Sequence, residues 1–182
     1  MGERVKETVR RLLGQGAVAR SHGYLDQAYG AFEQAVAISR DAGLDEELVD
    51  SLKSCAQIER DRGRSAGAIP LYEEAVSIGR KLGHSRTLSH TIRHLGDVQF
   101  EEGVLSDAEA CYVEALALYR AAIDTPKLEL ANAVRPLALL RQRTGQAEEA
   151  KRLWVEARDL YVAVGVAEGV HEAELHLDEV GT

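Results

Sequence analysis

The chain has 182 residues, of which 45% are hydrophobic, 29% are charged and only 5% are aromatic. This composition is that of a folded protein with a core, and the formal net charge of −8 argues against a nucleic-acid-binding surface, which is usually basic. No apolar run is long enough for a membrane span or a secretion signal, and two cysteines are too few for a disulfide framework. We therefore expect a cytoplasmic protein. Because Val and Ile are scattered without alternation, we also expect an all-α fold.

Amphipathic helices are predicted in pairs along the chain. In chain order, the pairs occupy residues 5–43, 44–83, 84–124 and 125–164, and a single shorter helix comes after them over 166–180. In each pair a glycine separates the two helices, because glycine at a helix end readily adopts the left-handed conformation that turns the chain. The last helix is rich in acidic residues, which predicts a solvated face that caps the array. We expect residues 1–182 to form a single domain.

A motif recurs in the second helix of every pair. An alanine, an aromatic residue and a second alanine follow the turn glycine at spacings of 5, 9 and 12, and the motif repeats after 40, 40 and 42 residues. The two alanines share one helix face, where their small side chains let a neighbouring helix come close. We predict that the aromatic residues are buried at repeat interfaces. The motifs are Gly23, Ala28, Phe32 and Ala35; Gly63, Ala68, Tyr72 and Ala75; Gly103, Ala108, Tyr112 and Ala115; and Gly145, Ala150, Trp154 and Ala157.

The first helix of each pair has its own marker, a small residue seven positions before the turn glycine. These residues are Gly16, Ala56, Gly96 and Ala138. Two prolines, Pro70 and Pro136, lie inside predicted helices, and we expect each to bend its helix locally.

This pattern resembles the tetratricopeptide repeat, whose signature is a small residue followed by Gly, Ala, an aromatic residue and Ala at these spacings. The resemblance covers roughly residues 5–164 and implies an α–α superhelix of four helix-turn-helix repeats closed by a C-terminal capping helix. The usual unit has about 34 residues. The longer units here are similar to those of kinesin light chains, of polarity adaptors that bridge G-protein subunits, and of the repeat tails of bacterial transcriptional activators. The proline common near the end of a unit is missing, and Arg40, Arg80 and Arg120 stand near its place.

The resemblance implies a binding function. Tetratricopeptide arrays bind peptides or proteins, usually along the concave side formed by the first helices of the pairs. The leading interpretation is therefore a non-enzymatic adaptor or scaffold with a protein or peptide partner, and with no nucleic acid or membrane as partner. The alternative is a regulatory or sensory module that self-associates or gates an effector domain. An enzyme subunit or cofactor site is a third possibility.

The same resemblance predicts which residues face the concave groove. Lys53, Arg93 and Arg135 occupy one position in successive units, and such a column of cations favours an acidic or carboxylate-bearing segment. The asparagines of chaperone-binding carboxylate clamps are absent, because Ala17, Gln57, Asp97 and Leu139 hold their place. The alternative is that these are ordinary solvated charges. The predicted groove residues are Arg10, Arg20, Lys53, Gln57, Arg60, His90, Arg93, Asp97, Phe100, Asn132, Arg135 and Arg143.

No catalytic residues, metal site or cofactor are predicted. His90, His94 and Asp97 lie at i, i+4 and i+7, so they could share a helix face and hold a metal ion, but a solvated polar face is the favoured interpretation. His171 and His176 are five residues apart and are expected on the surface of the cap.

Overall fold

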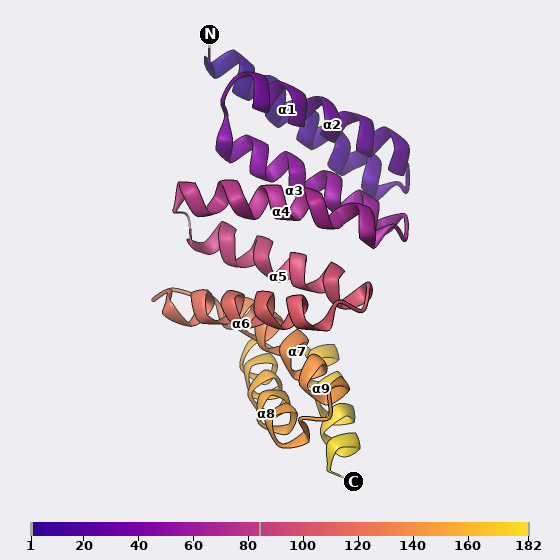
Figure 1. Ribbon diagram of the computed structural model, residues 1–182, viewed down its shortest axis with the longest axis vertical. Helices are drawn as coiled ribbons and strands as arrows, with labels where there is room; N and C mark the ends of the chain where they lie inside the picture. Colours follow the sequence, from indigo (N-terminus) through magenta and orange to yellow (C-terminus); the bar gives the residue numbers. More distant parts are fainter. Residues whose placement is uncertain (1, 84, 182) are drawn as a thin grey trace.

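The computed structural model describes residues 2–83 and 85–181, and every regular element in these ranges is an α-helix, which confirms the all-α prediction. Figure 1 shows the helices following one another from one end of the molecule to the other. The predicted start of the third unit at residue 84 lies outside the described residues. The helices are α1 (Gly2–Ser21), α2 (Leu25–Asp41), α3 (Asp45–Asp61), α4 (Ser65–Leu82), α5 (Ser85–Glu101), α6 (Leu105–Ala121), α7 (Lys127–Arg143), α8 (Ala147–Val164) and α9 (Ala167–Val180).

Consecutive helices pack against each other along the whole array. The first helices of the pairs are α1, α3, α5 and α7, and their partners are α2, α4, α6 and α8. The array also turns along its length, so that α7, α8 and α9 run steeply to the direction of α1–α6 (Figure 1). Both features are those of an α–α superhelix, as the tetratricopeptide resemblance implies. None of the helices in the described part of the chain combines the length and the apolar character needed to cross a bilayer.

Each pair turns at the glycine that the sequence predicted. At Gly63, for example, φ is 71°, the Gly63 N–H donates to the carbonyl of Arg60 (2.9 Å), and the Arg64 N–H donates to the carbonyl of Glu59 (2.8 Å). These two hydrogen bonds satisfy carbonyls that the end of the helix would otherwise leave without partners. A residue with a β-carbon would be strained at this φ, which explains why glycine recurs at every such turn.

The motif aromatics are buried, as predicted. Phe32, Tyr72, Tyr112 and Trp154 expose 3%, 1%, 2% and 0% of their surface. The small residue on the preceding helix makes room for the ring within the same pair: a β-carbon added at Gly16 would overlap the Phe32 ring, and one at Gly96 would lie 2.8 Å from Tyr112. The aromatic therefore joins the two helices of its own unit, while neighbouring core residues join it to the next.

The last helix packs as the predicted cap. Ala173 of α9 is fully buried in the core cluster that contains Trp154, and Val170 and Leu177 pack partly buried against the same cluster. His176 differs from its predicted surface position, because its ring stacks on the Trp154 indole with centroids 4.4 Å apart. The stack arises because α9 comes directly after α8 and lays one face across the end of that helix pair.

Candidate binding groove on the concave face

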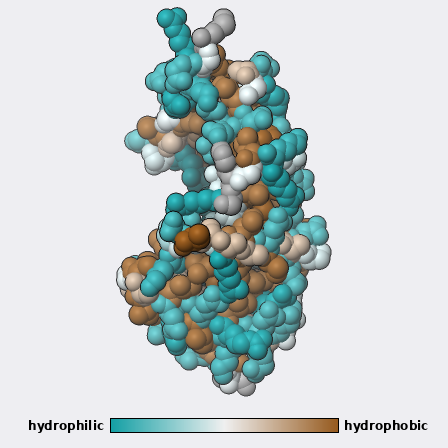
Figure 2. All heavy atoms as spheres, turned by 90° about the vertical axis from the view of Figure 1, so that its left-hand side faces the viewer, coloured by the Kyte–Doolittle hydropathy of each residue, from teal (hydrophilic) through white to brown (hydrophobic). Residues whose placement is uncertain are grey.

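A hollow of about 720 Å³ lies where α1, α3 and α5 face one another. Its apolar floor is formed by Leu13 and Ala17 of α1, together with the rings of Phe32 and Tyr72. Its lining also carries polar side chains that can donate or accept hydrogen bonds: Arg20, Ser21, Asp50, Lys53, Ser54, Gln57, Asp61, His90 and His94. In the side view of Figure 2 hydrophilic residues cover much of the surface, and the outline is indented in the amino-terminal half.

The predicted groove residues divide into two groups. Arg20, Lys53, Gln57 and His90 line this hollow. The others lie outside its lining. Arg10 pairs with Glu3 near the start of α1, and Asn132 accepts a hydrogen bond from the Tyr161 hydroxyl. The remaining residues make contacts within or between repeats: Arg60, Arg93, Asp97, Phe100, Arg135 and Arg143.

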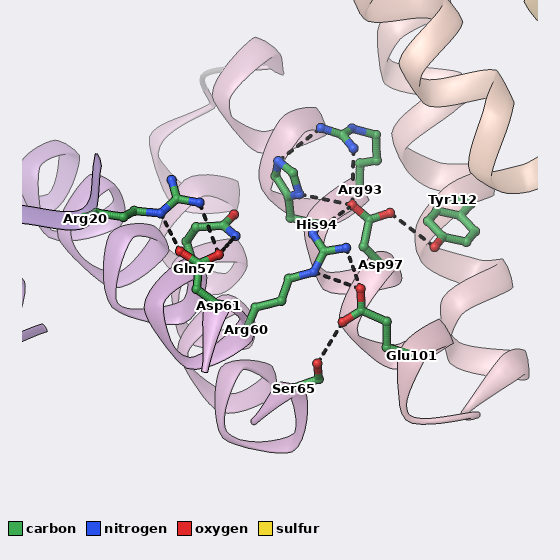
Figure 3. Close-up of polar contacts among 10 residues, drawn as sticks. All are labelled: Arg20, Gln57, Arg60, Asp61, Ser65, Arg93, His94, Asp97, Glu101 and Tyr112. Atoms are coloured by element: carbon green, nitrogen blue, oxygen red, sulfur yellow. Dashed lines mark hydrogen bonds and ion pairs between the residues drawn. The ribbon is translucent and has the colours of Figure 1, made fainter. Parts of the chain in front are cut away.

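A ladder of contacts crosses the repeats along this face. Arg20 Nε of α1 donates to Asp61 Oδ2 of α3 at 2.5 Å, and Arg60 Nη2 of α3 donates to Glu101 Oε1 of α5 at 2.5 Å (Figure 3). The third rung changes chemistry, because the Arg143 guanidinium of α7 lies 4.9 Å above the ring of Phe100. In every rung the two residues occupy the same pair of repeat positions, so the ladder links each first helix to the next.

Asp61 is ionised in this arrangement. Burial alone would raise the pKa of its carboxyl, but the hydrogen bonds from Arg20 and from Gln57 (Nε2 to Oδ1, 3.0 Å) hold the pKa below its usual value. The groove rim therefore carries fixed charges of both signs.

Asp97 is the centre of a second polar cluster, within α5 and α6. It accepts hydrogen bonds from His94 Nδ1 (3.1 Å), Arg93 Nη1 (3.2 Å) and the Tyr112 hydroxyl (3.2 Å), as Figure 3 shows. Burial opposes ionisation of this carboxyl, yet His94 and Arg93 lower its pKa. Only 13% of its side chain is exposed, so Asp97 organises its neighbours and offers little surface to a ligand.

These contacts assign the tautomer of His94. Its Nε2 lies 3.0 Å from Arg93 Nη2, and because a guanidinium can only donate, Nε2 must accept. The proton therefore sits on Nδ1, which donates to Asp97, and the ring is neutral. Burial lowers the pKa of His94 further, beside the Arg93 charge. Both ring nitrogens are thus engaged, and in the described residues no three His, Cys, Asp or Glu side chains are placed to hold a metal ion.

His90 lines the groove and has a buried ring nitrogen without a hydrogen-bond partner within the described residues. This nitrogen is Nδ1, and the ring contacts the His94 ring edge-on at 4.5 Å. Burial, followed by the nearby His94, Arg93 and Lys53, lowers the pKa of His90 to about 3. The imidazole is therefore neutral near pH 7.

The predicted column of cations is matched by carboxylates. Lys53 Nζ lies 3.3 Å from Asp50, Arg93 pairs with Asp97, and Arg135 makes two hydrogen bonds of 2.6 Å to Glu172 of α9. Of the three, Lys53 lines the hollow, and its partner Asp50 keeps 59% of its side chain exposed. Lys53 is therefore the column member best placed to meet a ligand.

Sequence reasoning missed a second ladder, on the second helices of the pairs. Arg40 bonds Glu74 at 2.8 Å, Arg80 bonds Glu114 at 2.8 Å, and Arg120 bonds Glu156 at 2.7 Å. These arginines replace the usual proline near the end of a unit, and each reaches the second helix of the next unit. The signal was present in the sequence, since both residue types recur with the period of the repeats.

Comparison with known proteins places the fold. No protein-family model and no curated protein matches the chain. Among solved structures, the putative kinesin light chain of Podosopora anserina, described as having nearly identical TPR-like repeats, has 20% identity and a TM-score of 0.78, over 94% of this chain and 85% of that one. BtubC (BKLC) from P. vanneervenii has 18% identity and a TM-score of 0.75, over 83% of this chain and 62% of that one.

A third similar structure is aspartyl phosphate phosphatase F from Bacillus subtilis, with 14% identity and a TM-score of 0.84. The alignment covers 95% of this chain but 45% of that protein. At such identities the likeness shows the fold alone. The resemblance to lengthened tetratricopeptide repeats is thereby confirmed at the level of the fold.

Proposed function

We propose that this protein is a non-enzymatic scaffold that binds a segment of a partner protein in the groove between α1, α3 and α5. The observation that carries the proposal is the hollow of about 720 Å³, which combines an apolar floor with a rim of polar side chains. Pockets of this composition favour one apolar anchor with a few oriented hydrogen bonds. The TPR-like repeats of the similar structures support a protein as the partner.

The titratable groups of the groove support a binding role over a catalytic one. His90 and His94 are neutral at pH 7, and Asp61 and Asp97 are ionised, each held there by burial or by fixed partners. A general acid or base works best with a pKa near the working pH. Because their protonation states do not change near pH 7, these groups are suited to binding a ligand and not to transferring a proton.

The chemistry of the rim suggests the kind of segment. A ligand carboxylate can reach Lys53, because an ammonium has three donors and the structure uses one of them, at 3.3 Å. An apolar ligand side chain would rest on Leu13, Ala17 and Phe32. We therefore propose an acidic or carboxylate-bearing segment with one apolar anchor. We also propose a cytoplasmic location, in keeping with the two free cysteines.

A selection experiment tests this proposal. Peptides from a phage-displayed random library are selected on the full chain, and the affinity of the recovered peptides is measured by fluorescence anisotropy. We expect Lys53→Glu to weaken binding at least about tenfold, because it turns an attraction into a repulsion. The matched control is Lys151→Glu, at an exposed lysine of α8, which should leave the affinity unchanged. Equal affinities of both variants and the wild type, with helicity intact by circular dichroism, would place binding outside this groove.

A further inference from the structure

The two ends of the array expose faces that the repeats inside it bury. Figure 1 places α1 at one end of the molecule and α9 at the other. Arg11, Gln15 and Val18 form a stripe on α1. The residues forty positions later on α3 are Ser51, Cys55 and Ile58, which expose 0%, 2% and 0%. Cys55 and Ile58 belong to the core cluster shared with α2. In α1 no such helix precedes the stripe within the described residues, and Val18 is 61% exposed.

The opposite end has the corresponding open face on α9. His171, Glu174 and Asp178 form a stripe of exposed residues there. Forty positions earlier on α7 stand Ala131, Val134 and Ala138, all fully buried. Beside this stripe Leu175 exposes 51% of its surface. Each end therefore keeps one exposed aliphatic side chain among polar residues.

The two ends carry opposite charge. Helix α1 contains five Arg or Lys and two Glu, whereas α9 contains five Asp or Glu and no Arg or Lys. On the open face of α1, the side chain of Arg11 contacts the neutral Gln15 and no carboxylate in the described part of the chain. On the open face of α9, Glu174 and Asp178 have no basic partner among the described residues.

From this complementarity we infer that copies of this chain stack head to tail, with α9 of one copy lying on α1 of the next. The acidic stripe of α9 meets Arg11, and Leu175 packs against Val18. In the later units the corresponding face of the first helix is covered by the second helix of the preceding unit, as α2 covers α3. In the proposed contact, α9 of the neighbouring copy covers this face of α1. Such a contact joins two different surfaces, so each added copy presents the same open face again and the row grows copy by copy.

Contacts between helices inside the molecule provide a precedent for this arrangement. Arg141 of α7 pairs with Glu109 of the preceding α6 at 2.5 Å, and Arg62, the residue directly after α3, pairs with Asp26 of the preceding α2. In both cases a cation in or directly after a first helix meets a carboxylate of the helix stacked before it. The proposed contact repeats that arrangement between molecules.

The test is sedimentation equilibrium of the full chain across a range of concentrations, at low and high salt. We expect the mean mass to rise continuously with concentration at low salt, and to fall toward that of the monomer as salt screens the charges. Arg11→Glu should weaken association roughly tenfold, and so should the pair Glu174→Arg with Asp178→Arg. Matched reversals away from the ends, Lys81→Glu and Glu102→Arg, should have no effect.

A charge swap decides the orientation of the contact. The chain that carries Arg11→Glu together with Glu174→Arg and Asp178→Arg should associate again, because both faces are reversed. Mass independent of concentration in the wild type would overturn the inference. So would a closed dimer that none of the end variants disturbs, and circular dichroism of each variant confirms that the fold is kept.

Discussion

In the first three repeats the concave side chains leave a hollow between α1, α3 and α5. On α7, by contrast, residues at the same repeat positions contact α9. Arg135 takes the position of Lys53 and Arg93, and it is gripped by Glu172 of α9. Gln142 takes the position of Arg60, donates to Glu179 at 2.8 Å and accepts from the Trp154 indole N–H at 3.0 Å. One scaffold thus uses equivalent positions for a groove in one region and for holding its cap in another.

The two regions differ in which helix lies beside each first helix on the concave side. In one region it is the next first helix, and in the other it is the capping helix α9. Between α1 and α5, Arg20 and Arg60 pair with carboxylates of the next first helix, while Lys53 and Arg93 pair with carboxylates of their own helices. At α7 the carboxylate that pairs with Arg135 comes from α9, whose His176 also stacks on Trp154. The amino-terminal region therefore presents polar groups to solvent or ligand, and the carboxyl-terminal region uses the same kind of groups for stability.

The largest expected effect comes from the buried motif aromatics. Tyr112→Ala and Trp154→Ala should each cost about 3–5 kcal/mol, because both rings are buried in one core cluster that relaxes only partly. Trp154→Ala should cost at least as much, since it also removes the support of His176 and Gln142. Urea unfolding measures both, with the exposed Tyr24→Ala as the control. A cost below about 1 kcal/mol for either ring would show that it does not anchor its unit.

A smaller effect is expected where glycine lies under the ring. Gly16→Ala would place a β-carbon inside the space that the Phe32 ring occupies, so it should destabilise the chain by about 1–3 kcal/mol. Gly30→Ala, in the middle of α2 with nothing within 4 Å of its β-carbon, should instead stabilise it by about 0.5–1 kcal/mol. The opposite signs, read from thermal unfolding, separate packing from helix propensity. Stabilisation by both variants would mean that α1 and α2 move apart freely to accept the added β-carbon.

The ion pairs should also differ between the regions. Glu172→Gln leaves Arg135 with a weaker partner and should cost about 1–2 kcal/mol. It should also speed hydrogen exchange of the α9 amides, because that pair ties the cap to α7. Asp61→Asn should leave exchange in α9 unchanged. Faster exchange of α9 in both variants would show that the array responds as one unit and that the two regions are not separable.

Acid should weaken the groove region first. His90 has a folded pKa of about 3 against an ordinary value of 6.5, so between these values the unfolded chain binds the extra proton. Stability is therefore full above pH 6.5 and falls as the pH drops toward 3, with a slope of at most about 1.4 kcal/mol per pH unit for this group. At the equivalent position α7 carries Asn132, which does not titrate. Denaturant midpoints at pH 7 and 5 should therefore differ less in His90→Gln than in the wild type, and equal losses would assign the acid sensitivity to other groups.

The fold was predictable because its signals are local and repeated. Glycines at the turns, alanines on one face and a ring between them occur in every unit, and each feature constrains only neighbouring helices. The cap was predictable for the same reason, since the acidic Glu174 and Asp178 stand on α9 where α7 has Val134 and Ala138. His176 was misjudged because its stacking partner Trp154 lies on another helix.

The candidate groove was less predictable because pairing between repeats depends on side-chain reach. The spacing of Lys53, Arg93 and Arg135 correctly puts them on equivalent positions, but it does not reveal that Asp50, Asp97 and Glu172 lie beside them. The column of cations as a binding feature stays a prediction, and the structure adds that each cation has a carboxylate beside it. The outer ladder could have been found by comparing charged positions one period apart.

That outer ladder is expected to contribute least. Arg80 and Glu114 expose 55% and 42% of their side chains, so water and salt screen the pair, and such pairs typically contribute about 0.2–1 kcal/mol. A double-mutant cycle with Arg80→Ala and Glu114→Ala should therefore give a coupling energy below about 0.5 kcal/mol that vanishes in high salt. The concave pair Arg60–Glu101 is less exposed, at 29% and 36%, and Glu101 also accepts a hydrogen bond from Ser65 at 2.7 Å. Its coupling should be larger and should persist in salt. If the outer pair couples as strongly as the concave pair, the outer arginines contribute to stability as much as the concave ladder does. The concave ladder would then not be the main contact that holds the repeats in register.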